Sequence, residues 1–362
     1  MDVPFLLVAV ALLVLGLLML ASAGGPTGYA QFGDTYYFLK HQLIFGFLPG
    51  LAIMIVLSRL PYQWWRTWAW ELLLVSIVLL VLVFIPGLRA EFGTSQSWIQ
   101  FGGLFSLQPA EIVKLTFLFY LAAWLERRDT SNVQDLSSGL LPFATVLGII
   151  LFLMALQPDV GTMVILAAMA LAVFFAAGAR LSHVGILACA GAFIVGILVL
   201  VAPYRLARFV AFLDPLRDPL GIGYHVNQAL LAIGTGGWIG RGFGHSIQKF
   251  QYLPEVVGDS IFAVIAEELG FLFTVPLILL FVALFLRGLR IAAGAPDRFG
   301  RYVVVGIVSW LVLQAFVNIG AMMSLLPITG VTLPLVSYGG TSLAITMGAI
   351  GVVLNVSRYA RR

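Results

Sequence analysis

Long apolar segments alternate with short polar ones along the whole chain. A helix needs roughly 20 mostly apolar residues to cross the hydrocarbon core of a bilayer. Ten segments of this kind lie near residues 3–23, 43–58, 68–86, 109–125, 140–157, 160–179, 183–202, 260–286, 302–326 and 335–357. The pattern predicts one all-α domain, residues 1–362, that forms a polytopic membrane protein of about ten transmembrane helices.

The first apolar segment ends in Ala21-Ser22-Ala23, which looks like a signal-peptidase site. A cleaved signal peptide has a basic start and a short apolar run. Here Asp2 is the only early charge and the apolar run is long. We therefore expect a retained helix.

Composition excludes a water-soluble fold. The chain has 362 residues, of which 61% are hydrophobic and 10% charged, and its mean hydropathy is +1.05. One water-soluble core cannot hide so much apolar surface. The single cysteine, Cys189, excludes a disulfide framework and a cysteine-ligated metal. The net charge of +4 comes from Arg and Lys near the ends of apolar segments, which is typical of membrane orientation and not of nucleic-acid binding.

Basic residues also predict the orientation. Ten crossings place both termini on one side, and the short loops of the other side hold only Lys40 and Arg89. The side of the termini holds Arg59, Arg66, Arg127, Arg128, Arg180, Arg287, Arg290, Arg298, Arg301, Arg358, Arg361 and Arg362. The positive-inside rule predicts that this side is cytoplasmic. The long loop of residues 203–259, between the seventh and eighth spans, is then extracytoplasmic.

The beginning of this loop carries two arginines. Residues 203–209 predict a short interfacial helix with Arg205 and Arg208 on one face. Guanidinium groups bind phosphate oxygens in a bidentate manner, which suits a pyrophosphate or a lipid head group. The alternative is that both side chains extend to the membrane surface, and the sequence leaves the two open.

Residues 234–244 are dense in glycine. Such a stretch permits close approach of the backbone to a ligand. It lacks the Gly-Lys-Ser/Thr ending of a phosphate-binding P-loop. A packed turn at the membrane surface is therefore the favoured interpretation.

Four carboxylates follow within fourteen residues, namely Glu255, Asp259, Glu267 and Glu268. Ionisable groups at a membrane boundary are costly and tend to serve a function. Partial burial would raise the pKa of a carboxylate towards the range that suits a general base. Asp259 could instead cap the helix that follows it, and the sequence does not decide between these roles.

Polar residues elsewhere fall near the same outer ends of the spans. Glu111 and Lys114 are three apart, and a structural ion pair is the favoured interpretation. Asp159, in a minimal turn, either caps a helix or faces the same cavity as the long loop. Asn318 and the irregular segment around Ser337 would line that space too, since non-helical backbone at membrane depth must be buried in protein or line a wet cavity.

Seven motifs occur in order along nearly the whole chain. They are Gly93–Ile99, Gln108–Lys114, Gln157–Thr162, Gly234–Gly244, Leu253–Asp259, Ala266–Gly270 and Pro334–Gly340. In this set and order the chain resembles the SEDS family (shape, elongation, division and sporulation). Arg205, residues 209–215 and residues 248–250 look closer to its division branch (FtsW-like) than to its elongation branch (RodA-like).

The resemblance implies a peptidoglycan glycosyltransferase in the bacterial cytoplasmic membrane. Such an enzyme joins lipid II units by β-1,4 linkages and releases undecaprenyl pyrophosphate. The family's key carboxylate falls on Asp259. Val257-Gly258 stands where the family commonly has His-Thr, so a role of that histidine does not carry over.

The expected division of labour follows from this resemblance. Asp259 takes the proton of the attacking hydroxyl, and Glu255 orients it or shares a divalent cation. Positive charge stabilises the departing pyrophosphate. The basic candidates are Lys249 and Arg205, followed by Arg208 and Arg241. No strong metal-ligand spacing is present, and a requirement for Mg or Mn stays open.

The resemblance also implies a partner, a class B penicillin-binding protein whose membrane helix docks on the bundle. Two rival functions remain. A lipid-linked oligosaccharide flippase would place ionisable groups near the bilayer midplane, often within inverted repeats, and no convincing repeat is visible. A non-catalytic scaffold for division would tolerate replacement of Asp259.

Overall fold

The computed structural model describes residues 1–85, 89–92, 95–101 and 105–360. Gly93 and Thr94 of the first motif, and Arg361 and Arg362 of the basic set, lie outside the described residues. The helices are α1 (Val3–Phe32), α2 (Tyr37–Gln42), η1 (Leu43–Phe47), α3 (Leu48–Arg59), α4 (Gln63–Thr67), α5 (Ala69–Leu82), α6 (Pro109–Glu126), α7 (Thr130–Val133), η2 (Leu136–Leu140), α8 (Leu141–Ala155), α9 (Val160–Ala176), α10 (Leu181–Val201), α11 (Pro203–Leu213), α12 (Tyr224–Gly236), α13 (Ile261–Leu269), α14 (Phe271–Ala293), α15 (Arg298–Met322) and α16 (Gly340–Tyr359).

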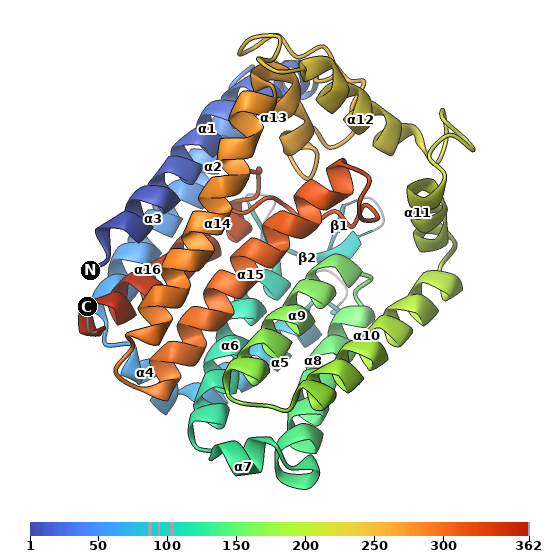
Figure 1. The fold of residues 1–362 in the computed structure, drawn as a ribbon. Helices are drawn as coiled ribbons and strands as arrows, with labels where there is room; N and C mark the ends of the chain where they lie inside the picture. Colours follow the sequence, from blue (N-terminus) through green and yellow to red (C-terminus); the bar gives the residue numbers. More distant parts are fainter. Residues whose placement is uncertain (86–88, 93–94, 102–104, 361–362) are drawn as a thin grey trace.

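The predicted polytopic helical bundle is confirmed (Figure 1). Within the described ranges, seven helical segments are long and apolar enough to cross a membrane. Helices α5 and α9 are apolar but shorter, and α6 carries Glu111, Lys114 and Glu126 within its 18 residues. Each of the ten predicted segments contains helix, and the number of ten crossings stays a prediction.

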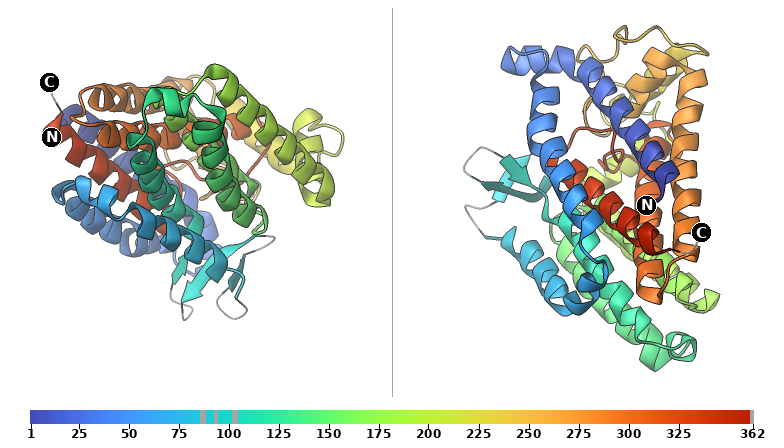
Figure 2. Two further views of the ribbon diagram at one scale, coloured as in Figure 1. Left: turned by 90° about the horizontal axis from the view of Figure 1, so that it is seen from below. Right: turned by 90° about the vertical axis from the view of Figure 1, so that its left-hand side faces the viewer.

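A small sheet departs from the all-α prediction. Strands β1 (Arg89–Phe92), β2 (Ser95–Phe101) and β3 (Phe105–Leu107) pair antiparallel in the order β1-β2-β3, and the sheet projects beside the bundle in Figure 2. Ser97 Oγ of β2 donates to the carbonyl of Gln157 at 2.9 Å. Thr341 Oγ1 donates to the carbonyl of Ser106 at 3.2 Å. These contacts tie the sheet to the start of α16 and to the turn before α9.

Both termini lie at one end of the bundle, as an even number of crossings requires (Figures 1 and 2). The backbone nitrogen of Asp2 donates to Ser357 Oγ at 2.9 Å, and Arg287 pairs with the Asp2 carboxylate at 2.9 Å. Helices α12 and α13 lie at the opposite end (Figure 1).

Burial differs strongly between the helices. Most residues of α15, α16 and α6 are buried in the centre of the bundle. In α10 only His183 is buried, and in Figure 1 this helix runs from beside α9 to α11 at the edge of the molecule. Most side chains of α10 are therefore exposed or only partly buried by protein.

Two predicted segments have different limits in the structure. The segment 260–286 is not one helix, because Gly270, at φ 71°, separates α13 from α14. The last helix begins only at Gly340, and residues 334–339 before it are irregular, as expected. The helix predicted for residues 203–209 is confirmed as part of α11, and its interfacial position stays a prediction.

The glycine-rich turn packs against α13, which confirms the favoured interpretation. The amides of Arg241 and Gly242 donate to the carbonyls of Glu267 and Glu268, each at 2.9 Å. This backbone contact needs a residue without a side chain at the end of α12. A Cβ atom on Gly236 would lie 2.0 Å from the carbonyl oxygen of Ala266.

We predict that Gly236→Ala destabilises the protein, because the new methyl group meets fixed backbone. Overpacking of this kind costs on the order of 1–3 kcal/mol. Gly234→Ala, two residues earlier in α12, has nothing within 4 Å of its Cβ. It should be neutral or slightly stabilising. Thermal unfolding in detergent compares the two variants, and an equal melting temperature for both would contradict the packed turn.

Candidate active site

Asp259 is buried in the turn that leads into α13, with 8% of its surface exposed. Asn318 of α15 holds this turn from below. Its Nδ2 donates to the backbone carbonyl of Asp259 at 2.8 Å and to that of Val331 at 2.8 Å. One amide therefore joins the Asp259 turn to the irregular segment before α16.

The turn before Asp259 is closed by its own backbone. The carbonyl of Glu255 accepts from the amides of Gly258 at 2.9 Å and Ser260 at 3.2 Å. The side chain of Glu255 is exposed. Tyr338 donates its amide to the carbonyl of Val257 at 2.8 Å, which fixes the turn from the side of the last irregular segment.

Ser337 has a structural position in that segment. Its Oγ accepts from the amide of Leu333 at 2.8 Å, and its carbonyl accepts from Gln42 Nε2 at 3.3 Å. The side chain is buried. Ser337 thus shapes the loop that contacts the Asp259 turn, and the structure shows no contact of its hydroxyl with Asp259 itself.

The surroundings of Asp259 make it a weak acid. Burial raises the pKa of its carboxyl, the negative charge of Glu255 raises it further and the positive charge of Arg208 lowers it, with a result of about 7. A general base is most useful when its pKa lies near the working pH. Of the four carboxylates within residues 255–268, Asp259 is the one whose environment suits this role.

Of the four basic candidates, Arg208 of α11 acts electrostatically on Asp259. The side chain of Arg205 turns towards α10, where its Nη1 donates to the carbonyl of Leu198 at 3.0 Å. Arg241 lies 3.6 Å from Glu267 and is partly exposed. Arg208, which is exposed, is thus the basic candidate whose charge acts on the carboxylate.

Lys249 occupies a different position from the one expected. Its Nζ donates to Glu268 Oε1 at 2.7 Å, to the carbonyl of Gly244 at 2.8 Å and to Ser22 Oγ at 2.9 Å. The residue is 3% exposed. Because all three ammonium protons have partners inside the protein, Lys249 has none left for a pyrophosphate, and we remove it from the phosphate-binding candidates.

Glu267 and Glu268 bind the loop of residues 244–249. Glu267 accepts from the amides of Ile247 at 3.1 Å and Gln248 at 3.2 Å. Glu268 accepts from the amide of Gly244 at 2.9 Å. Both carboxylates are buried and serve as anchors of this loop to α13.

A second polar cluster lies deeper in the bundle. The expected ion pair forms between Lys114 Nζ and Glu111 Oε1 at 2.8 Å, and Lys114 also donates to Gln314 at 2.8 Å. Asp159 accepts from the amide of Thr162 at 3.1 Å, as a helix cap does. Its other oxygen accepts from Gln108 Nε2 at 3.0 Å.

The two clusters share one helix. Gln314 Nε2 donates to the carbonyl of Thr332 at 2.9 Å, and Asn318, one turn later on α15, reaches Val331. Glu111 Oε2 and Asn318 Oδ1 are buried and have no hydrogen-bond partner among the described residues. The predicted residues Glu111, Lys114 and Asn318 thus belong to one connected polar region below Asp259.

The sequence did not identify His225 and Ser260 as candidate site residues. Nε2 of His225, on α12, lies 2.7 Å from Ser260 Oγ, immediately after Asp259. The two residues are 35 positions apart, and neither belongs to a recognisable motif. Only the fold brings them together.

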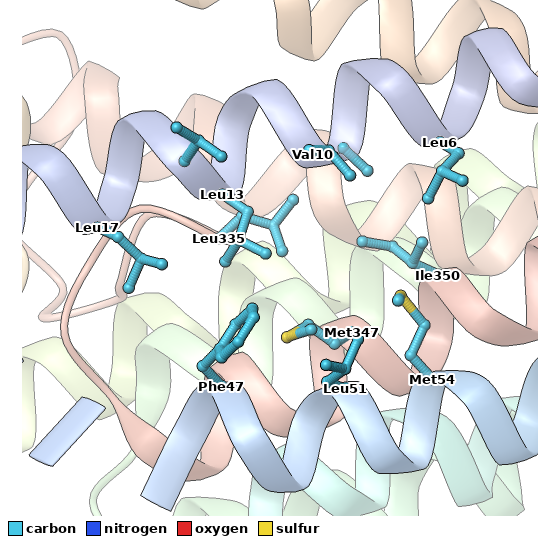
Figure 3. Close-up of a pocket in the computed structure, with 12 residues that line it drawn as sticks. Leu6, Val10, Leu13, Leu17, Phe47, Leu51, Met54, Leu335, Met347 and Ile350 are labelled. Atoms are coloured by element: carbon cyan, nitrogen blue, oxygen red, sulfur yellow. The ribbon is translucent and has the colours of Figure 1, made fainter. Parts of the chain in front are cut away.

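An apolar cavity of about 270 Å³ lies elsewhere, between α1, α3 and α16 (Figure 3). All its lining side chains are apolar, among them Leu13, Phe47 and Met347. It offers no partner to a sugar or a phosphate. The candidate active site is therefore the polar turn around Asp259 and not this cavity.

Within the part of the chain that the structure describes, no group of three or more His, Cys, Asp or Glu side chains could hold a metal ion. Asp259 and Glu255 supply two carboxylates at most. Mg²⁺ commonly binds one or two carboxylates and takes its remaining ligands from water and substrate phosphates. This donor set is too small to fix a cation by itself.

Known proteins match the chain along its whole length. The family model described as cell cycle protein, for FtsW, RodA and SpoVE, matches residues 3–362. Stage V sporulation protein E of Bacillus subtilis (strain 168) is 42% identical over 99% of this chain and 98% of its own. The probable peptidoglycan glycosyltransferase FtsW of Trichlorobacter lovleyi is 43% identical over 98% of this chain and 93% of its own.

Two solved structures of this kind of protein are also similar to the chain over its whole length. A chain in a peptidoglycan synthase complex, whose structure concerns the coordination of polymerization and crosslinking, superposes with a TM-score of 0.81 at 29% identity, covering 100% of this chain and 98% of that one. The rod shape determining protein RodA of Thermus thermophilus superposes with a TM-score of 0.72 at 27% identity and the same coverage.

We predict that breaking the buried ion pair of Lys249 and Glu268 unfolds the outer loop. Lys249→Met leaves the Glu268 carboxylate buried without its cation, a change that typically costs about 3–5 kcal/mol. The double variant Lys249→Met with Glu268→Gln should recover part of this loss. Arg241→Ala is the control, because its 3.6 Å contact is partly exposed. Equal melting temperatures for Lys249→Met and Arg241→Ala would contradict the anchoring role.

Proposed function

Because the chain belongs to the FtsW, RodA and SpoVE family of cell cycle proteins, we propose that it is a peptidoglycan glycosyltransferase that polymerises lipid II. Identity of 43% to an FtsW and 42% to stage V sporulation protein E, against 27% to RodA, favours the FtsW-like branch. Asp259 carries the proposal, because it is a buried carboxylate with a pKa of about 7 at the end of a membrane bundle.

The reaction joins two lipid-linked sugars. The 4-hydroxyl oxygen of the acceptor forms a bond to the anomeric carbon of the donor, while the bond from that carbon to the pyrophosphate breaks. Attack opposite to the leaving group inverts the anomeric carbon and yields a β-1,4 linkage. Undecaprenyl pyrophosphate leaves, and the hydroxyl proton passes to the Asp259 carboxylate.

Two neighbouring groups have opposite effects on this base. Glu255 raises the pKa of Asp259 and Arg208 lowers it. Arg208 also supplies positive charge where the pyrophosphate develops negative charge, and such an electrostatic role needs only a positioned cation. Arg205 and Arg241 are weaker candidates for stabilising the pyrophosphate, because their side chains already contact Leu198 and Glu267.

The distribution of basic residues also supports a location and an orientation for the protein. The chain is a multi-pass membrane protein, and we place it in the bacterial cytoplasmic membrane with both termini in the cytoplasm. The excess of arginine in the loops on the side of the termini supports this orientation. The Asp259 turn, at the other end, then faces the outer leaflet and its lipid-linked substrate.

A class B penicillin-binding protein is the proposed partner. The structure with the TM-score of 0.81 belongs to a peptidoglycan synthase complex that coordinates polymerization and crosslinking. A partner that crosslinks glycan would act on the product of this reaction. The exposed apolar sides of the bundle could receive its membrane helix.

A lipid II flippase or a non-catalytic scaffold for cell division would need no general base. A polymerisation assay distinguishes these functions from the proposed one. It combines the purified protein with its cognate class B partner and labelled lipid II. We expect polymer from the parent chain. An intact parent complex that forms no polymer would exclude the glycosyltransferase.

We predict that Asp259→Ala and Asp259→Asn each reduce glycan polymerisation by at least about 10²-fold, the usual contribution of a general base. The control is Asp34→Asn, which alters a partly exposed carboxylate paired with Lys40 and should polymerise normally. Size-exclusion profiles establish that each variant is folded. Polymer at the parental rate from Asp259→Asn would remove this residue from the chemistry.

The pH dependence provides a separate prediction. The base acts in its ionised form, so the polymerisation rate should rise with pH through a midpoint near 7. Glu255→Gln removes a negative charge that opposes ionisation, and the midpoint should move to lower pH. Glu71→Gln, an exposed change at the start of α5, should leave it in place. A midpoint that moves to higher pH in Glu255→Gln would contradict the assigned electrostatics.

A further inference from the structure

A histidine from α12 contacts the residue that follows Asp259. His225 Nε2 lies 2.7 Å from Ser260 Oγ. The same hydroxyl lies 2.7 Å from the carbonyl oxygen of Pro254 and 3.4 Å from Asp259 Oδ1. Ser260 is fully buried. One hydroxyl group therefore connects an imidazole, a backbone carbonyl and the carboxylate of the candidate base.

Proton counting assigns the direction of these contacts. A serine hydroxyl has one proton to donate and two lone pairs that accept. The carbonyl of Pro254 and the ionised carboxylate of Asp259 can only accept. If His225 also accepted, three acceptors would compete for one proton, and at least one of the two acceptors at 2.7 Å would face a lone pair of Ser260. The imidazole therefore donates its Nε2 proton to Ser260.

The charge of the ring agrees with this assignment. Burial of His225 and the nearby positive charge of Arg208 lower its pKa to about 4. A neutral imidazole carries one N–H, on either nitrogen. With that proton on Nε2, the ring stabilises the hydroxyl without adding charge to the site.

We propose that His225 is a positioning residue for Asp259 that acts through the Ser260 hydroxyl. Its donated hydrogen bond keeps the serine proton on the side of the two acceptors, where it can turn to the carboxylate when Asp259 is ionised. The inference rests on the proposed function, in which Asp259 is the general base. It adds two residues, from α12 and from the start of α13, to the control of that base.

The direction of the effect follows from the groups around Asp259. The charged groups that act on it are Glu255, from its own turn, and Arg208, from α11. Asn318 contacts only its backbone carbonyl. A hydrogen bond to the carboxylate favours the ionised form. Loss of the donor should therefore make Asp259 harder to ionise.

The test separates hydrogen bonding from shape. His225→Phe keeps an aromatic ring but removes the donor, whereas His225→Gln keeps an N–H near the position of Nε2. Ser260→Ala removes the hydroxyl, and a double variant combines His225→Phe with Ser260→Ala. In the purified full chain, the rate at which dicyclohexylcarbodiimide modifies Asp259 is followed by peptide mass across a pH series. The reagent attacks protonated carboxyl groups, so the rate falls as Asp259 ionises.

We expect the midpoint of this decline to rise by about half a pH unit in His225→Phe and in Ser260→Ala, as for loss of one weak hydrogen bond to a carboxylate. His225→Gln should match the parent, and the double variant should shift no further than either single one. A parental midpoint in His225→Phe, or a shift in the double variant equal to the sum of the two, would overturn the proposal.

Polymerisation by the same proteins keeps the two hypotheses apart. The modification assay needs no lipid II, so its outcome holds whether or not the parent forms glycan. With an active parent, His225→Phe should lose rate below the midpoint and regain it at higher pH. An inactive parent whose Asp259 still titrates with the expected shifts would contradict the glycosyltransferase and retain the contact.

Discussion

The structure around the candidate base depends on two buried carboxylates in the last turn of α13. Glu267 and Glu268 accept hydrogen bonds from the backbone amides of the loop that follows the glycine-rich turn. Backbone groups buried inside protein are rarely left unpaired, because water cannot reach them. The carboxylates supply those partners, and Lys249 balances the charge of Glu268. This anchorage fixes α13, and Asp259 lies at the other end of that helix.

The same arrangement explains why one carboxylate is a candidate base and its neighbours are not. Glu267 and Glu268 are buried but bound by amide, hydroxyl and ammonium donors. Asp259 is also buried, yet among the described side chains only Ser260 hydrogen-bonds its carboxylate, at 3.4 Å. A buried carboxylate with few donors binds a proton more tightly. Sparse solvation of the charge, not mere location in the loop, therefore distinguishes Asp259.

The sequence predicted those features that depend on local pattern. Hydropathy located the helices, and the three-residue spacing of Glu111 and Lys114 predicted their ion pair. The sequence could not predict contacts between distant segments, such as Lys249 with Ser22 or His225 with Ser260. Glu267 and Glu268 are the only charges in a long apolar segment that continues past Gly270, so hydropathy alone joined α13 to α14. The strands at residues 89–107 are too short to give a clear alternating pattern.

Asp259 and Arg208, whose charge acts on it, are anchored very differently. Asp259 is held by Asn318 and by the turn that Tyr338 contacts, whereas Arg208 comes from α11, which follows a helix with only His183 buried. Between helices in lipid there is no hydrophobic driving force, so packing alone must hold them together. Few packing contacts hold helix α10 against the rest of the bundle. The site thus combines a fixed carboxylate with an arginine on a weakly packed arm. Because the charge on Arg208 lowers the pKa of Asp259, any displacement of that arm away from the turn must also make the base harder to ionise.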